Sequence, residues 1–118
     1  MPVFDVFFTC FQILAMIKNQ HYLYRMTVLL AISMLASVVS QDVLINSMLP
    51  VIVSAAKDKV PNVKFNVAKM LQRIVPLLDR QIVERTIKPC LSELCDDSDM
   101  DVRFYARQTM SITDGAAA

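Results

Sequence analysis

The stretch VPNVKFNVAKM at residues 60–70 recurs in altered form as DMDVRFYARQT at residues 99–109. Both contain a valine, a cation and a phenylalanine in succession, and their valines are separated by 102 − 63 = 39 residues. A motif that recurs at a fixed interval of about 20 to 50 residues indicates a stack of similar supersecondary units. The sequence therefore predicts a protein built from repeats.

The 39-residue register extends beyond this motif, because Pro50 aligns with Pro89 and Asp58 aligns with Asp97. In the middle repeat, apolar residues follow one another at intervals of three or four, which is typical of helices with one buried face. They are Leu44, Met48, Ile52 and Ala55 in a first helix and Val63, Val67, Leu71, Ile74 and Leu78 in a second. Each unit is therefore expected to be a pair of helices, with the column of Val63 and Val102 packed inward.

The expected fold is all-α, because the single glycine in 118 residues argues against folds rich in tight hairpin turns. Two-helix units of about 40 residues bury their apolar faces only by stacking. We therefore predict an α-solenoid of about three HEAT repeats, each an antiparallel helix pair, in one domain over 1–118. The repeat units are expected at about 3–40, 41–79 and 80–115, and the helices at 3–17, 21–39, 43–57, 61–78, 82–95 and 100–112.

Pro50 and Pro89 lie well inside the expected first helices of their units. Proline removes a backbone hydrogen bond at such a position and kinks the helix. We therefore expect a bend at the same place in both repeats. Pro61, in contrast, suits the first turn of a second helix, where its missing N–H would have no intrahelical partner.

The second helices begin with a column of cations, Arg25, Lys64 and Arg103, at intervals of 39. Lys64 follows Asp58 by six residues, and Arg103 follows Asp97 by the same interval. In a stack, the cation of one repeat can reach the turn of its own or of the neighbouring repeat, forming a ladder of charge-assisted hydrogen bonds. The alternative is that these cations bind a partner directly.

The charge balance gives no overall field that would attract nucleic acid or an anionic membrane, since 12 basic and 11 acidic side chains leave a net charge of +1. The middle repeat has a basic face without an RNA-binding signature, which we interpret as solvated helix surface. Its cations are Lys57, Lys59, Lys64, Lys69 and Arg73. No nucleic-acid partner is expected.

The apolar opening MPVFDVFFTCFQILAMI covers 17 residues before Lys18, whereas a membrane span needs about 20. It contains Asp5 and lacks the basic region of a signal peptide. The hydrophobic content of 55% suggests a membrane-associated helical protein as an alternative, but charged residues interrupt every candidate span. A buried helix is therefore expected here, and no membrane partner.

Cys10, Cys90 and Cys95 form no CxxC pair, which favours reduced, buried thiols in a cytosolic protein over a redox or metal role. We accordingly expect a cytoplasmic protein, with the nucleus as a second location.

No metal, cofactor or catalytic site is expected. The acidic run before residue 102 has the alternation of a calcium-binding EF-hand loop, but Val102 stands where that loop requires glycine and Gln108 where it requires glutamate. His21 is the only histidine, so a zinc site and a serine nucleophile both lack the necessary partners. We predict that the protein is not an enzyme.

Four runs of sequence resemble the last HEAT repeats of the scaffold (A) subunit of protein phosphatase 2A, in particular the plant forms. They are NQHYLYRMTVL at 19–29, KDKVPNVKFNVAKM at 57–70, KPCLSEL at 88–94 and DMDVRFYA at 99–106. The likeness covers about residues 12–113 and keeps the repeat spacing. Because the family is a longer array, the resemblance implies a chain truncated at its N-terminal end, where MPVFDVFFTCF departs from the family pattern.

The resemblance implies a non-catalytic scaffold that binds the phosphatase catalytic subunit through a ridge of intra-repeat turns, at 18–25, 57–65 and 96–104. The regulatory B-type subunit, which the family holds through earlier repeats, is not expected to bind this segment directly. A HEAT-type transport or assembly adaptor for another protein client is the alternative. The implied contact residues are Tyr22, Arg25, Met26, Lys57, Val60, Pro61, Asn62, Lys64, Phe65, Asp101, Arg103 and Phe104.

The expected opening helix has one broad apolar face, formed by Val3, Phe4, Phe7, Phe8 and Phe11. A terminal repeat of a solenoid needs a polar outer side for solubility. We therefore expect self-association through residues 3–11.

Overall fold

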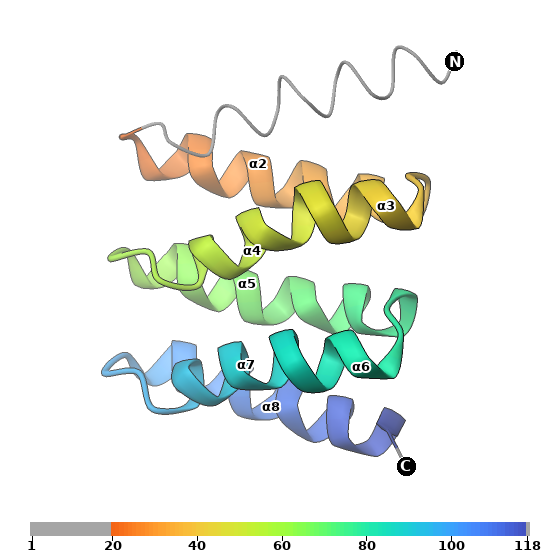
Figure 1. The fold of residues 1–118 in the computed structure, drawn as a ribbon. Coiled ribbons are helices and arrows are strands. Elements are labelled where there is room, and N and C mark those ends of the chain that lie inside the picture. The colour runs from red at the N-terminus through yellow and green to blue at the C-terminus, as the bar shows by residue number, and fades with distance from the viewer. Residues whose placement is uncertain (1–19, 118) are drawn as a thin grey trace.

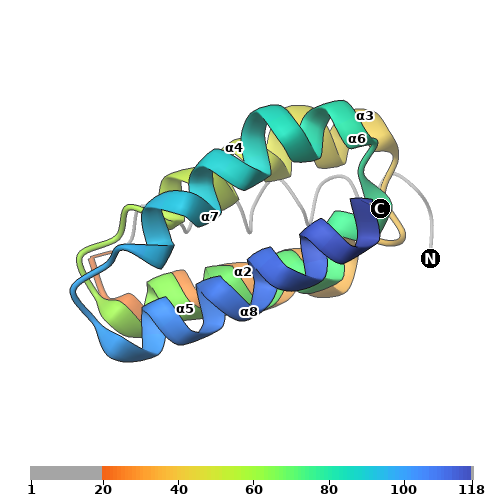
Figure 2. The ribbon, with the colours of Figure 1, turned by 90° about the horizontal axis from the view of Figure 1, so that it is seen from below.

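The computed structural model describes residues 20–117, which form a stack of helices in two layers (Figure 1, Figure 2). One layer holds the second helices of the three repeats. They are α2 (Tyr22–Leu35), α5 (Pro61–Ile74), which a 3-10 turn η3 (Val75–Leu77) extends, and α8 (Met100–Ala117).

The other layer holds the first helices of the second and third repeats, and each is a rod of three consecutive helical segments. The first rod joins α3 (Gln41–Val43), the π-helix η2 (Leu44–Met48) and α4 (Leu49–Ala55). The second rod joins α6 (Arg80–Ile82), the π-helix η4 (Val83–Ile87) and α7 (Lys88–Cys95). The helix expected at 3–17 lies outside the described residues.

The prediction of an all-α, HEAT-like solenoid is confirmed, and no strand occurs within residues 20–117. Two expected helix ends are wrong. Helix α2 stops at Leu35 rather than residue 39, because the chain turns there before Ser40 begins the next helix. Helix α8 continues to Ala117 rather than ending at 112, since one glycine without a following proline does not terminate a helix.

The expected bends at the two prolines take the form of π-helical segments. The N–H of Leu49 donates to the carbonyl of Leu44, and the N–H of Lys88 donates to that of Val83, each five residues back. The prolines follow directly, and a proline ring would otherwise clash with the carbonyl four residues before it. The irregularity thus recurs at the repeat interval, since 83 − 44 = 39.

The first helices also begin alike, at caps that are 79 − 40 = 39 residues apart. The hydroxyl of Ser40 accepts a hydrogen bond from the N–H of Val43 at 3.3 Å. The carboxylate of Asp79 accepts one from the N–H of Ile82 at 3.1 Å. Each cap satisfies one of the backbone donors that have no partner in the first turn of a helix.

The core lies where the two layers meet. Val63 and Val102 are fully buried, as predicted for their column, and they share the core with apolar side chains of the first helices such as Ile52 and Leu91. The interface between α5 and α8 also contains buried polar contacts: the hydroxyl of Thr109 donates to the carbonyl of Ala68 at 2.8 Å and accepts from Gln72 Nε2 at 2.9 Å.

Among residues 20–117, no helix combines the length and the apolar character needed to cross a bilayer. Cys90 is buried and Cys95 partly buried, and both are free thiols. Burial is the main reason why the pKa of Cys90 rises to about 11, so this thiol stays protonated at neutral pH. Both cysteines therefore behave as small apolar residues, as expected.

Candidate functional site

The turns between the first and second helices lie along one edge of the stack, and the turns between repeats lie along the opposite edge (Figure 1). This first edge contains residues 56–60 and 96–99, with residues 20–21 at the start of α2. We call it the ridge. It brings together three segments of the chain that are far apart in sequence.

An ion pair connects the first and second repeats at the ridge. Arg25 Nε donates to Asp58 Oδ2 at 2.6 Å, and Arg25 Nη2 donates to Asp58 Oδ1 at 3.1 Å. The two side chains are only 12% and 10% exposed, respectively. A bidentate contact with this little exposure is stronger and better oriented than an ordinary surface ion pair.

A second ion pair connects the second and third repeats in the same way. Lys64 Nζ donates to Asp97 Oδ2 at 2.5 Å. The partners are 97 − 64 = 33 residues apart, as are Arg25 and Asp58. The prediction of a ladder is confirmed, and both cations reach the turn of the following repeat.

Each ladder aspartate also holds its own turn together. Asp58 Oδ1 accepts a hydrogen bond from the N–H of Val60 at 2.9 Å, and Asp97 Oδ1 accepts one from the N–H of Asp99 at 2.9 Å. Burial alone would raise the pKa of both carboxyl groups. The hydrogen bonds and nearby cations outweigh burial, so the pKa of each lies below its ordinary value.

Arg103, the third cation of the column, bonds to its own turn. Its Nη1 donates to the carbonyls of Asp97 at 2.8 Å and Ser98 at 2.9 Å. Arg25 Nη1 makes the corresponding bond to the carbonyl of Gln20 at 2.8 Å. Both arms of the prediction therefore occur, because these arginines contact their own turn and Arg25 also contacts that of its neighbour.

The acidic run in the third turn serves to cap α8. Asp99 Oδ1 accepts hydrogen bonds from the N–H groups of Asp101 at 2.9 Å and Val102 at 3.1 Å. Asp101 lies in the first turn of α8, where its charge complements the positive end of the helix dipole. The alternate spacing of these aspartates therefore has a structural explanation.

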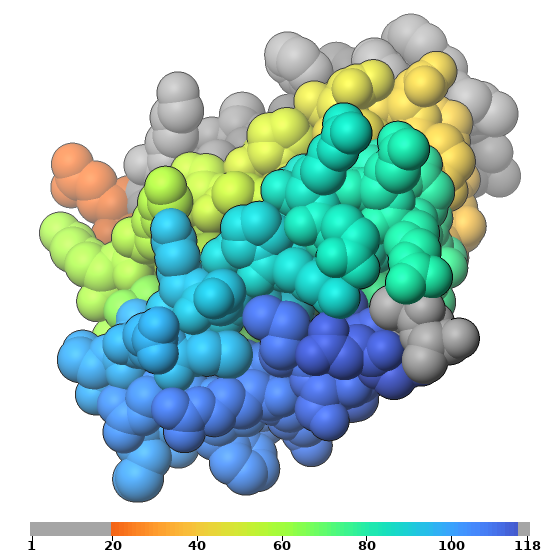
Figure 3. All heavy atoms as spheres, turned by 60° about the horizontal axis from the view of Figure 1, so that its bottom comes forward, coloured from red at the N-terminus to blue at the C-terminus, as the bar shows by residue number. Residues whose placement is uncertain are grey.

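The apolar column of Met26, Phe65 and Phe104 is not buried uniformly. Met26 and Phe65 pack against the core, and the ring of Phe65 lies 5.6 Å from that of Tyr105 in the next repeat. Phe104 is 60% exposed. Helix α8 forms the lower side of the molecule in the space-filling view, with no described element beyond it (Figure 3).

The implied contact residues thus divide into two groups. Arg25, Lys64 and Arg103 are engaged within the ridge, and Met26, Val60 and Phe65 are half-buried against the core. The others are exposed, and we call them the exposed ridge residues: Tyr22, Lys57, Pro61, Asn62, Asp101 and Phe104.

Two polar residues have structural roles that the sequence analysis missed. His21 caps α2, because its Nδ1 accepts a hydrogen bond from the N–H of Leu23 at 3.3 Å. Lys88 bridges two helices of the third repeat, with Nζ 2.9 Å from Glu84 Oε1 and 3.0 Å from Asp114 Oδ1. The interval of four between Glu84 and Lys88 was a visible signal for the first of these pairs.

Curated relatives match long parts of the chain. The chain is 38% identical to the PP2A regulatory A-type protein of Saccharomyces cerevisiae over 98 residues, which is 78% of this chain and 15% of the relative. It is 47% identical over 53 residues to the beta isoform of the human 65 kDa regulatory A-type protein of serine/threonine-protein phosphatase 2A, covering 45% of this chain and 9% of the relative.

A plant relative gives a similar result. The alpha isoform of the 65 kDa regulatory A-type protein of phosphatase 2A from Arabidopsis thaliana is 49% identical over 59 residues, covering 50% of this chain and 10% of the relative. No protein-family model matches the chain. The matched segments cover only 9% to 15% of these three relatives. Over the segment that it shares with them, the chain is a homologue of the regulatory A-type proteins of protein phosphatase 2A.

Proposed function

We propose that the chain is a non-catalytic scaffold segment that binds the catalytic subunit of protein phosphatase 2A through its ridge. The observation that carries the proposal is the alignment of the intra-repeat turns along one edge, at spacings that the ladder maintains. The named relatives are regulatory subunits of this phosphatase, which supports the choice of partner. Cytoplasmic location belongs to the same proposal.

The two groups of ridge residues have different tasks in this proposal. The exposed ridge residues make the contacts with the partner. Lys57, Asn62 and Phe104 together offer a charge, an amide and an aromatic ring on the second and third turns. Arg25 and Lys64 position the turns, since their charges are already neutralised by aspartates.

A ridge held by ion pairs suits a binding surface, because a preorganised surface loses less conformational entropy on association. The two turns are fixed by side-chain bonds within each turn and between repeats. The partner would therefore meet exposed side chains at fixed spacing.

The test is capture of purified catalytic subunit by the tagged chain. A ridge variant, Lys57→Glu with Phe104→Ser, should lose most of the capture, because it removes one exposed charge and one exposed ring from two turns. The matched control, Arg85→Glu with Met34→Ser, changes an exposed cation and an exposed apolar residue away from the ridge. It should capture as much as the unmodified chain.

Equal capture by the folded ridge variant and the control would overturn the ridge as the binding surface. Absence of capture by the unmodified chain, with native circular dichroism, would overturn the choice of partner and favour an adaptor for another client.

A further inference from the structure

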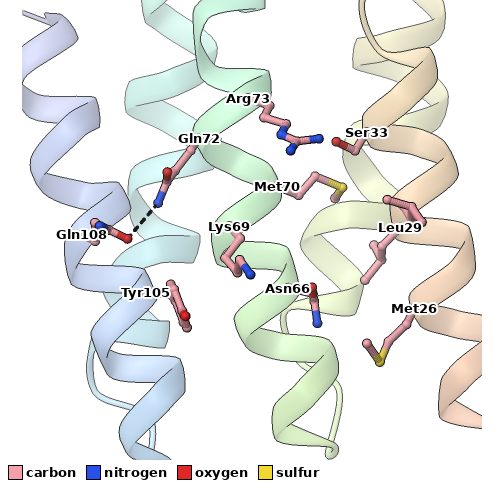
Figure 4. Close-up of a pocket in the computed structure, with 11 residues that line it drawn as sticks. Met26, Leu29, Ser33, Asn66, Lys69, Met70, Gln72, Arg73, Tyr105 and Gln108 are labelled. Carbon is pink, nitrogen blue, oxygen red and sulfur yellow. Dashed lines mark hydrogen bonds between the residues drawn. The ribbon is translucent and has the colours of Figure 1, made fainter.

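A groove crosses the second helices on the side that faces away from the first helices (Figure 4). Residues from α2, α5 and α8 line it. The α2 wall is apolar and includes Met26, Leu29 and Leu30. Leu30 is 59% exposed, so this wall offers apolar surface to a ligand.

The opposite wall, on α5, is cationic. Lys69 and Arg73 line the groove, and both are exposed. Neither forms an ion pair with a carboxylate of residues 20–117, in contrast to Arg25 and Lys64 in the ladder. No acidic residue lines the groove among the residues that the structure describes.

The spacing of these two cations leaves their charges uncompensated. Residues four apart lie on the same helix face, and two like charges in this arrangement destabilise a helix. The ammonium of Lys69 lies 5.1 Å from the centroid of the Tyr105 ring on α8, which holds this charge over the groove. A carboxylate from a ligand would relieve the repulsion and would contact both cations.

We propose that this groove binds an acidic peptide segment that carries an apolar side chain next to its carboxylates. The carboxylates lie against Lys69 and Arg73, and the apolar side chain covers Leu30 and Met26. The site is independent of the proposed function, because none of the exposed ridge residues lines the groove.

A peptide fits the groove better than nucleic acid or an anionic membrane does. Binding to a phosphate backbone or a lipid surface relies on many cations, since each contributes only a small amount. This groove has two, beside a wall of thioether and aliphatic carbon. Charge and apolar contact must therefore come from the same short ligand.

The test measures fluorescence anisotropy of short labelled peptides with the full chain. The first probe contains glutamate and leucine, the second has serine in place of leucine, and the third has glutamine in place of glutamate. The first should bind, with an affinity that falls as salt is added. Equal affinity for the second or third probe would overturn the combined requirement for charge and apolar contact.

Variants locate the binding. Lys69→Gln with Arg73→Gln should weaken binding of the first probe by about 5- to 30-fold, the range expected when two exposed charge pairs are lost. Lys59→Gln with Arg85→Gln removes the same number of exposed cations outside the groove and should change affinity less than about twofold.

Two outcomes would overturn the proposal. One is equal weakening by both double variants when circular dichroism melts show both to be folded. The other is co-sedimentation with vesicles of anionic phospholipid without binding of any peptide probe, which would assign the cations to a membrane surface.

Discussion

Replacing Asp58 with asparagine tests the ladder at its bidentate link. The substitution keeps the size of the side chain and an acceptor for the N–H of Val60, but it removes the charge that accepts two hydrogen bonds from Arg25. The Arg25 guanidinium is mostly shielded from water and would lose its counter-charge. The folded state should therefore lose stability through this one pair.

The magnitude follows from the geometry. A hydrogen bond to a charged group contributes about 1.5–3 kcal/mol, and loss of one partner from a fully buried pair costs about 3–5 kcal/mol. The pair of Arg25 and Asp58 retains some exposure, so we expect a loss of about 2 kcal/mol in the free energy of unfolding. Urea denaturation followed by circular dichroism measures this loss.

A double-mutant cycle separates the ion pair from other effects of each substitution. The cycle uses Arg25→Gln, Asp58→Asn and the combined variant, with Arg85→Gln as an exposed cation that forms no ion pair within residues 20–117. We expect an interaction energy of about 1–2 kcal/mol and almost no effect of the control. An interaction energy below about 0.5 kcal/mol would refute the reasoning, because it is the value of an ordinary surface pair.

Three further predictions concern the same fold. The Lys64–Asp97 link should show a smaller interaction energy than the Arg25–Asp58 link in an equivalent cycle, because an ammonium makes one contact where a guanidinium makes two; a larger value would contradict this. Because the pKa of both aspartates is lowered, their contribution to stability is complete above the ordinary value of 3.8 and is lost as pH falls below it, so unfolding curves at decreasing pH should decline more steeply for the unmodified chain than for Asp58→Asn with Asp97→Asn; parallel declines would argue against the ladder. Gly115→Ala should raise the free energy of unfolding by up to about 1 kcal/mol, since no atom lies within 4 Å of the added methyl group and alanine favours a helix; a lower melting temperature would contradict it.

The repeat interval carried most of the fold into the sequence-based prediction. It identified the buried column of Val63 and Val102, and it placed an acceptor and a cation close enough for the ladder. These features follow from periodicity, because residues in equivalent positions of a stack meet equivalent neighbours.

Features that depend on a neighbouring side chain were beyond such a prediction. Phe65 and Phe104 share a column, yet the former packs against Tyr105 and the latter is exposed. The π-helical segments were also missed, since a proline in a helix predicts an irregularity but not which hydrogen bonds replace the lost one. The exposed ridge residues could not be separated from the half-buried ones, because both groups lie within one turn of helix.

The ladder has a consequence for how such a chain can change in length during evolution. Its links join residues 33 positions apart, and the caps at Ser40 and Asp79 differ by one 39-residue unit. Excision of residues 41–79 would bring Asp97 to position 97 − 39 = 58, where it meets Arg25, and Ser40 would take over the cap of the remaining first helix. A whole unit can therefore be gained or lost by recombination without leaving an unpaired charge at the junction.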